Sequence, residues 1–353
     1  MARHGRKWYS PPVRYFESKA VLITGGTGSL GRTLCRLLLA ESKVRKVVVY
    51  SRDELKQYEL AHTPGIGDDE RVRFFLGDVR DKERLGRAFE GIELVVHTAA
   101  LKQVPAAEYN PFEAVKTNVI GAQNIIDAAI DRKIARVIAL STDKAANPVN
   151  LYGATKLCSD KLFVAGNAYV GPRASRFAVV RYGNVIGSRG SVIPYFLRLR
   201  RSGKLPITDV RMTRFWITLE GAARFVLASL VRMSGGEMYV PKLPSTKITD
   251  VARAIAPDAD HEVVGIRPGE KLHEVLITED EARKTIDLGD RFVILPPVEW
   301  QAPDREHVGA HCPEGFRYSS DSNDQWLAIP EIRKLIAGLS LPEVAEWKAE
   351  LGL

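Results

Sequence analysis

The sequence predicts an α/β protein with a doubly wound parallel sheet and a smaller α/β domain attached to it. Two observations lead to this fold class. Short apolar runs typical of buried strands alternate with helical patterns through the first half of the chain. Polar or glycine-rich residues follow directly after several of these runs, as they do where ligands bind at the carboxyl ends of parallel strands.

Length and composition narrow the class of protein. At 353 residues the chain can form one large domain and a smaller one. Its formal charge of +8 favours anionic ligands, and phosphorylated small molecules explain it better than nucleic acid, because no aromatic-basic interleaving occurs. The 3 cysteines are widely spaced, so we expect no metal site and reduced thiols in a cytoplasmic protein.

The basic segment 1–16 is expected to be a flexible arm or a contact in a homo-oligomer. No apolar signal-peptide core follows it, and no run in the chain reaches the length of a transmembrane helix. We therefore expect a protein that does not enter the membrane.

The first apolar run, 20–24, leads at once into a glycine-rich turn and then a helix. This order favours a Rossmann-like site for the pyrophosphate of a dinucleotide over a purely structural turn. Gly25 permits the tight turn, Gly28 lets the backbone approach the pyrophosphate, and Gly31 lets the helix pack on the strand. The predicted cofactor-binding residues of this turn are Gly25, Thr27, Gly28, Ser29, Leu30 and Gly31.

The second strand, 46–50, ends where NAD-specific folds usually carry an acid for the ribose hydroxyls. Ser51 and Arg52 stand there instead, and Lys56 follows one helical turn later. A guanidinium and an ammonium suit a 2′-phosphate, so the sequence favours NADP. Asp53 could cap the next helix or reach a ribose hydroxyl, and the basic pair could simply be solvated surface.

The third and fourth strands end in further candidates for the cofactor site. Asp78 could accept a hydrogen bond from the adenine amino group while Val79 packs on the ring. Asn118, on a helix predicted over 111–131, is a candidate for bonding the backbone beside the active site. His97 ends an apolar strand and is interpreted as structural. The loop after the fourth strand supplies the predicted residues Ala99, Ala100 and Lys102.

The fifth apolar run, 137–140, ends in hydroxyl, acid and ammonium side chains, and a predicted helix then carries Tyr152 and Lys156. Four residues apart, these two side chains lie on one face of the helix. A tyrosine is a useful base only where positive charge stabilises its phenolate, and Lys156 supplies such charge one turn away. The sequence therefore predicts a reaction centre here.

Beyond the Tyr152 helix, a strand runs into a glycine-rich loop that reads as a second phosphate cradle. Less regular segments follow, with polar-aromatic and basic clusters that suit a nucleotide or form surface turns. We predict a dinucleotide-binding domain over 17–184 and a mainly substrate-binding domain over 185–353, partly interleaved with the first. Its predicted substrate-binding residues are Asn184, Ser191, Val192, Arg214, Arg267 and Glu270, together with Lys102 of the first domain.

Four long runs resemble one family in the extended short-chain dehydrogenase/reductase superfamily, the inverting UDP-N-acetylglucosamine 4,6-dehydratases of the pseudaminic acid pathway type. The runs are STDKAANPVNLYGATK at 141–156, RYGNVIGSRGS at 181–191, RPGEK at 267–271, and YSS through WL at 318–327. The resemblance covers nearly the whole chain from about residue 17. It departs mainly before Lys19 and over 291–312.

The resemblance implies a lyase that uses NADP and UDP-N-acetylglucosamine and inverts C5. Transient oxidation at C4, loss of water across C5 and C6, and return of the hydride to C6 would follow in that order. Tyr152 would take the proton of the 4-hydroxyl, with Thr142 bonded to the 4-oxygen. A protonated Asp143 would donate its proton to the departing 6-hydroxyl, and a neutral Lys144 would remove the C5 proton. Lys144 and Tyr152 could exchange roles at C5.

Three alternatives stay open from the sequence. A UDP-sugar C4 epimerase or a configuration-retaining dehydratase could use the same scaffold, but an epimerase would not need the Asp143–Lys144 pair. Retaining relatives usually carry membrane helices and lack the tyrosine. A regulator that binds NADP without catalysis is disfavoured by the intact Tyr152–Lys156 pair.

Overall fold

The computed structural model describes residues 12–170, 175–188, 190–296 and 307–352. Residues 1–11 of the predicted arm, Arg189 and part of the 291–312 region lie outside the described residues. Within the described part, no helix is both long enough and apolar enough to cross a membrane.

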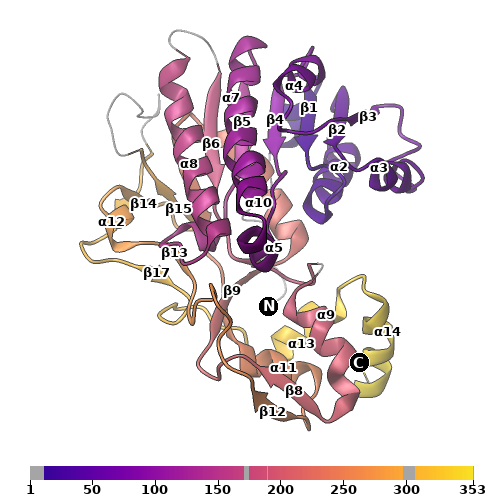
Figure 1. Cartoon of the computed structure of the whole chain (residues 1–353), viewed down its shortest axis with the longest axis vertical. Helices are drawn as coiled ribbons and strands as arrows, with labels where there is room; N and C mark the ends of the chain where they lie inside the picture. The colour runs from indigo at the N-terminus through magenta and orange to yellow at the C-terminus, as the bar shows by residue number, and fades with distance from the viewer. Residues whose placement is uncertain (1–11, 171–174, 189, 297–306, 353) are drawn as a thin grey trace.

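A sheet of 10 strands forms the large body in the upper part of Figure 1, in the order β16-β14-β15-β10-β6-β5-β4-β1-β2-β3. Strands from β3 across to β10 pair in parallel, and β15, β14 and β16 add antiparallel pairs at the other edge. The predicted doubly wound sheet is therefore confirmed. Its strands are β1 (Ala20–Thr24), β2 (Lys46–Ser51), β3 (Val72–Leu76), β4 (Leu94–His97), β5 (Arg136–Leu140), β6 (Arg176–Val180), β10 (Met238–Pro241), β14 (Thr285–Asp287), β15 (Arg291–Ile294) and β16 (Ala310–His311).

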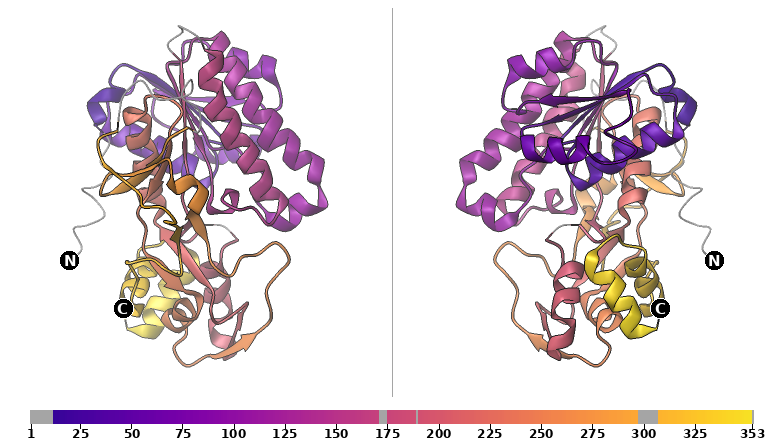
Figure 2. Two further views of the ribbon diagram at one scale, coloured as in Figure 1. Left: turned by 90° about the vertical axis from the view of Figure 1, so that its left-hand side faces the viewer. Right: turned by 90° about the vertical axis from the view of Figure 1, so that its right-hand side faces the viewer.

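Helices cover both faces of the sheet, as the two side views in Figure 2 show. Helices α4, α7 and α8 pack together on one face, and α2 and α10 pack together on the other. The central strands read as continuous apolar runs because both of their faces are buried. These helices are α2 (Ser29–Glu41), α4 (Lys82–Ala88), α7 (Gly121–Asp131), α8 (Leu151–Tyr169) and α10 (Leu219–Arg232), with α3 (Glu54–Ala61), α5 (Val104–Tyr109) and α6 (Pro111–Val115) beside them.

The helix predicted over 111–131 is not continuous. A π-helical segment, Lys116–Ile120, separates α6 from α7. Such segments insert an extra residue into the helical ladder and occur frequently at functional sites. The side chain of Asn118 projects from this segment.

A second body, lower in Figure 1, has its own apolar core, which includes Trp216, Ile255 and Trp347. The chain enters it after β6, returns to the large sheet at α10 and β10, and then leaves again. It returns once more for β14, β15 and β16 and ends in the second body. The division predicted at 184/185 remains a prediction. The remaining elements are β7 (Asn184–Val185), α9 (Val192–Leu199), β8 (Lys204–Ile207), β9 (Thr213–Ile217), β11 (Ser245–Lys247), α11 (Ile248–Ile255), β12 (Asp260–Val263), β13 (Val275–Ile277), α12 (Glu279–Ala282), β17 (Tyr318–Ser319), α13 (Ile329–Ala337) and α14 (Pro342–Leu351).

Candidate functional site

The glycine turn after β1 forms a cradle at the start of α2. Gly25 has a φ of +64°, and a Cβ there would lie 2.9 Å from the backbone nitrogen of Ala99. Only glycine fits this conformation and this space. Gly28 is the N-cap of α2, and no side chain caps that helix. A Cβ on Gly28 would approach only the carbonyl of Gly25 within 4 Å, so the cradle suits the pyrophosphate of a dinucleotide.

The predicted 2′-phosphate residues lie at the ends of β2 and β3. The Ser51 hydroxyl accepts hydrogen bonds from the Thr27 hydroxyl at 3.1 Å and from the Asp53 N–H at 3.3 Å. Asp53 caps α3 and forms an ion pair with Lys56, so the capping alternative for Asp53 is the one seen. Arg52 is half-exposed and has a terminal nitrogen 3.6 Å from Asp78.

Asp78 is held in place by its own loop. Its carboxylate accepts hydrogen bonds from the Arg80 guanidinium, at 3.0 and 2.7 Å, and from the Arg80 backbone N–H. Burial alone would raise the pKa of Asp78, but the Arg80 hydrogen bonds outweigh burial and lower it. Val79 beside it is buried.

Asn118 ties the loop after β4 to α8. Its amide accepts from the Leu101 N–H and donates to the Leu101 carbonyl, both at 2.9 Å, and it also donates to the Thr155 hydroxyl at 3.0 Å. Asn118 therefore bonds the backbone of the loop that carries Ala99, Ala100 and the exposed Lys102. The π-helical segment gives the amide the position from which it reaches both partners.

The loop 141–150 packs closely on the first turn of α8. The Asn150 side chain caps the helix by accepting from the Gly153 N–H at 2.8 Å. A Cβ on Gly153 would lie 2.1 Å from the Lys144 carbonyl oxygen, so this position needs glycine. Tyr152 and Thr142 come together at this contact.

The buried Asp143 and the partly buried Lys144 form an ion pair beside Tyr152. One Asp143 oxygen accepts from the Thr142 hydroxyl at 2.8 Å and from Lys144 Nζ at 3.1 Å. Its other oxygen is buried without a hydrogen-bond partner among the described residues. Lys144 Nζ also lies 3.4 Å from Glu274 Oε1, a contact that the sequence analysis did not foresee.

These charges decide the protonation of the cluster. Burial would lower the pKa of Lys144, but Asp143 and Glu274 outweigh it and raise that pKa above its ordinary value. This arrangement favours the ammonium form rather than the neutral Lys144 of the sequence-based hypothesis. The neutral pair differs from the ion pair by one proton shift from Nζ to Asp143 across 3.1 Å.

The main positive charge that acts on Tyr152 comes from Lys144 and not from the expected Lys156. Burial raises the pKa of Tyr152 to about 12, while the charge of Lys144 and the Thr142 hydroxyl act in the opposite direction. Burial also lowers the pKa of Lys156, and Asp160 opposes that effect. The sequence analysis assigned the stabilisation of the phenolate to Lys156 one turn away, whereas the charge of Lys144 acts on the phenol here.

A second group of charged side chains lies between α8, β6 and α12. Asp160 accepts from the Ser141 hydroxyl at 2.5 Å and lies 3.7 Å from Arg181 Nη2. The fully buried Arg181 donates to both carboxylate oxygens of Glu281 at 2.9 Å. Neither Asp160 nor Glu281 belonged to a sequence motif, since their meeting depends on tertiary contacts between α8, β6 and α12.

Two polar atoms from the second body lack partners where substrate is predicted to bind. The amide oxygen of Asn184 on β7 is buried without a hydrogen-bond partner in the described part of the chain. The same holds for the hydroxyl of Ser191, the N-cap of α9, whose first residue is Val192. Unpartnered buried polar atoms are costly, so these two suit a polar ligand.

Arg214 turns into the protein. Its guanidinium donates to the carbonyls of Thr213, Lys271 and Leu272 at 2.7 to 3.1 Å, and its nitrogens lie 3.6 Å from Glu270 and 3.5 Å from Glu274. Arg267 is exposed. Arg214 thus already has protein partners, in contrast to the open arginine that a phosphate-binding role suggests.

The loop 267–274 clasps the loop 141–150. Lys271 Nζ donates to the Ala146 carbonyl, and the Asn150 side chain donates to the Gly269 carbonyl at 2.7 Å. With the Lys144–Glu274 contact, the C-terminal part of the chain touches the predicted reaction centre at several points.

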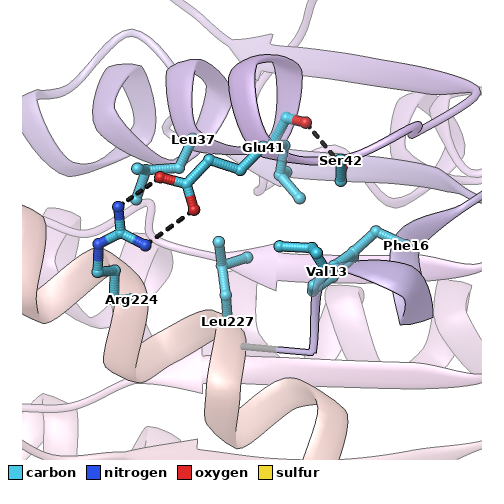
Figure 3. A pocket seen from close by; sticks show the side chains of 8 residues that line it. Val13, Phe16, Leu37, Glu41, Ser42, Arg224 and Leu227 are labelled. Carbon is cyan, nitrogen blue, oxygen red and sulfur yellow. Dashed lines mark hydrogen bonds and ion pairs between the residues drawn. The ribbon is translucent and has the colours of Figure 1, made fainter. Parts of the chain in front are cut away.

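The small apolar pocket in Figure 3 lies elsewhere, between the helical turn Val13–Phe16, α2 and α10. Glu41 and Arg224 form an ion pair at its side. None of the predicted site residues lines it, so it has no part in the chemistry described above.

The glycine cradle, the doubly wound sheet and the Tyr152 helix define a protein of the short-chain dehydrogenase/reductase type, with the epimerase and dehydratase fold. The chain belongs to the polysaccharide biosynthesis protein family, whose model matches residues 21–296.

Two curated relatives illustrate the range of activities in this family. The chain is 51% identical over 330 residues to a Campylobacter jejuni UDP-N-acetylglucosamine 4,6-dehydratase (inverting), covering 91% of this chain and 98% of that protein. It is 39% identical over 287 residues to a Rickettsia conorii UDP-glucose 4-epimerase, covering 79% and 83%. The family resemblance drawn from the motifs is confirmed.

Solved structures agree on the fold. Pen from Bacillus thuringiensis matches with a TM-score of 0.83 and 36% identity, over 91% of this chain and 98% of that one. DesIV, a dTDP-glucose 4,6-dehydratase from Streptomyces venezuelae solved with NAD bound, matches with a TM-score of 0.63 and 25% identity, over 72% and 86%. Structural neighbours therefore bind a nicotinamide dinucleotide.

His97 beneath the site should make folding sensitive to acid. Its Nδ1 lies 2.8 Å from the Thr24 hydroxyl, and burial, aided by Lys156, lowers its pKa to about 3. Unfolding releases a histidine that binds a proton near pH 6.5, so stability falls as pH drops below that value. Between pH 7 and 5, His97 should cost the folded state about 2 kcal/mol.

Urea denaturation at both pH values measures this effect. His97→Asn should reduce the loss by about 2 kcal/mol, and His62→Asn, an exposed control, should leave it unchanged. An unchanged pH dependence in His97→Asn would refute the assignment.

Proposed function

We propose that this chain is an inverting UDP-N-acetylglucosamine 4,6-dehydratase that uses NADP. Its product would be UDP-2-acetamido-2,6-dideoxy-β-L-arabino-hex-4-ulose. The observation that carries the proposal is the cluster of the buried Asp143 with the partly buried Thr142, Lys144 and Tyr152, in a chain 51% identical to an inverting dehydratase. An epimerisation needs a base at one hydroxyl, whereas a dehydration also needs an acid and a base near C5 and C6.

We assign the protein's part in the oxidation at C4 to Tyr152 and Thr142. Tyr152 takes the proton of the 4-hydroxyl, and Thr142 holds the 4-oxygen. The positive charge of Lys144 favours the phenolate needed for this step. We assign the same role to Lys156, which lies one helical turn further along α8. The bound nicotinamide ring supplies the acceptor and donor of the hydride.

We assign the loss of water to the Asp143–Lys144 pair. A proton shift along the 3.1 Å contact converts the ion pair into a carboxylic acid and a neutral amine. The amine takes the proton from C5, and the acid gives its proton to the 6-hydroxyl, which leaves as water.

The final proton reaches C5 from the opposite face. Tyr152, protonated in the first step, can donate it and return to the phenolate, while the C5 proton on Lys144 and the ionised Asp143 have already restored the ion pair. All transferred protons are then accounted for, and C5 is inverted. The converse assignment of Lys144 and Tyr152 at C5 conserves protons only if another group takes up the proton of the 4-hydroxyl.

Substrate binding falls to the second body. Asn184 and Ser191 offer polar atoms that have no hydrogen-bond partner among the described residues, and the contacts of loop 267–274 bring Glu270 beside the reaction centre. We assign Lys102, Val192, Arg214 and Arg267 to the same role. For Arg214 this requires an exchange of its present internal partners, or an indirect role through Glu270.

A UDP-sugar C4 epimerase is the second candidate. The 39% identity to the Rickettsia conorii UDP-glucose 4-epimerase favours it. It leaves the Asp143–Lys144 pair without a chemical task.

A proton NMR time course with UDP-N-acetylglucosamine in deuterated water tests the proposed function. We expect a new C6 methyl signal, deuterium at C5 and the inverted C5 configuration, with activity lost by at least ~10²-fold in Tyr152→Phe because the base is removed. A C4 epimer would support the second candidate, and an unchanged sugar would contradict both. Wild-type turnover by Tyr152→Phe would contradict its role.

Arg52 tests the choice of NADP. Arg52→Ala should weaken NADPH binding roughly tenfold, because one charge-assisted contact to the 2′-phosphate is lost, and should leave NADH binding unchanged. Fluorescence titration measures both, with the exposed Arg253→Ala on α11 as a charge-matched control. Tighter binding of NADH than NADPH by the wild-type protein would contradict the proposed cofactor.

A further inference from the structure

Glu274 is a buried carboxylate whose backbone is held by the segment 318–320. It directly precedes β13, which pairs with β17. Its backbone N–H donates to the Ser320 hydroxyl at 2.9 Å, and its carbonyl accepts from the Ser320 N–H at 2.9 Å and from the Ser319 hydroxyl at 3.3 Å. The segment 318–320, conspicuous in the sequence but without a chemical role, thus fixes the position of one acid.

The Glu274 side chain points at the reaction centre. Its Oε1 lies 3.4 Å from Lys144 Nζ and 3.5 Å from Arg214 Nε, and its Oε2 is buried without a hydrogen-bond partner among the described residues. Asp143 contacts the same amine at 3.1 Å. Lys144 is therefore held between two carboxylates, one of them 130 residues further along the chain.

The charges that face Lys144 come from every element packed around it. The negative ones are Asp143 beside it and Glu274, and the phenol of Tyr152 on α8 adds negative charge when it ionises. Arg214 on β9 and Lys271 on the clasping loop are positive. The contact distances show that the two carboxylates are the direct partners of the amine among these groups.

We propose that Glu274 is a positioning residue of the dehydration site, which holds the amine of Lys144 against Asp143 and keeps it protonated in the free enzyme. Its negative charge opposes the transfer of the Lys144 proton before substrate is bound. Only the consequence for catalysis rests on the proposed function. The effect on Lys144 itself depends on the geometry alone.

Chemical labelling of Lys144 tests this effect without turnover. The NADP-loaded protein, without sugar, is treated with trace acetic anhydride at pH 9, and acetylation of Lys144 is measured by mass spectrometry relative to the exposed Lys43. Only the neutral amine reacts. In Glu274→Gln the pKa of Lys144 should fall by about 1 unit, so its reactivity should rise roughly tenfold.

Two variants separate charge from packing. Glu274→Asp keeps the charge but shortens the side chain, so Lys144 should stay within about twofold of its wild-type reactivity. Glu270→Gln removes a carboxylate of the same loop that contacts Arg214 and not Lys144, so it should produce no rise. Equal rises in Glu274→Gln and Glu274→Asp would show loosened packing and overturn the proposal.

Ser320→Ala tests the same effect on Lys144 in a variant that keeps the Glu274 carboxylate. It removes the hydroxyl that accepts from the Glu274 N–H, so Lys144 reactivity should rise about twofold to threefold. If Glu274→Gln fails to fold by circular dichroism, this variant decides the matter. Wild-type reactivity in Ser320→Ala, or in a folded Glu274→Gln, would overturn the proposal.

The pH dependence of turnover links the proposal to catalysis. In Glu274→Gln the acid limb of the kcat profile should move to lower pH by about 1 unit, because the Asp143–Lys144 pair loses a negative neighbour. If the wild-type protein does not dehydrate UDP-N-acetylglucosamine, the proposed function fails while the labelling result still stands. If acetylation of Lys144 rises in Glu274→Gln but the pH profile of kcat does not move, only the catalytic part of the proposal is overturned.

Discussion

The contact of Lys144 with Asp143 and Glu274 is the interaction on which the account of this protein depends. Asp143 reaches it from the carboxyl end of β5 in the large sheet, and Glu274 reaches it from the start of β13. The parallel sheet and the C-terminal segments thus hold opposite sides of one ammonium group. Because Asp143 and Glu274 are buried, a proton moved by a few ångströms changes the energy of the cluster more than it would in water.

This arrangement has a thermodynamic cost. Buried ion pairs contribute little net stability, since the loss of hydration offsets most of their attraction. The chain carries a second such group, in which the fully buried Arg181 links Asp160 to Glu281. Stability must therefore come from the apolar cores of the two bodies, while the neutral His97 limits it at low pH.

Much of the fold and part of the site could be predicted from the sequence, because their signals are local. The turn from Gly25 to Gly31 directly follows a buried strand, and Tyr152 and Lys156 are separated by one helical turn. The mixed α/β fold follows from the alternation of strands and helices. The break of the helix around Asn118 has no comparably clear signal, since Lys116–Ile120 contains no proline or glycine and only Gly121 directly follows it.

The remaining site features depend on contacts between distant segments. Glu274 meets Lys144 across 130 residues, and spacing along the chain could not reveal that meeting. The same reason explains why the sequence analysis took Lys144 as neutral and treated Arg214 as open to a ligand. Each conclusion depends on carboxylates that only the folded chain brings near, Glu274 for both and Glu270 for Arg214.

The central claim is that one buried cluster carries out both the oxidation at C4 and the dehydration across C5 and C6. It is tested most directly with UDP-N-acetylglucosamine deuterated at C4, followed by NMR and mass spectrometry of the product. The account predicts one deuterium in the C6 methyl group of each product molecule. A product with an unlabelled methyl group, or recovered sugar that keeps deuterium only at C4, would contradict it.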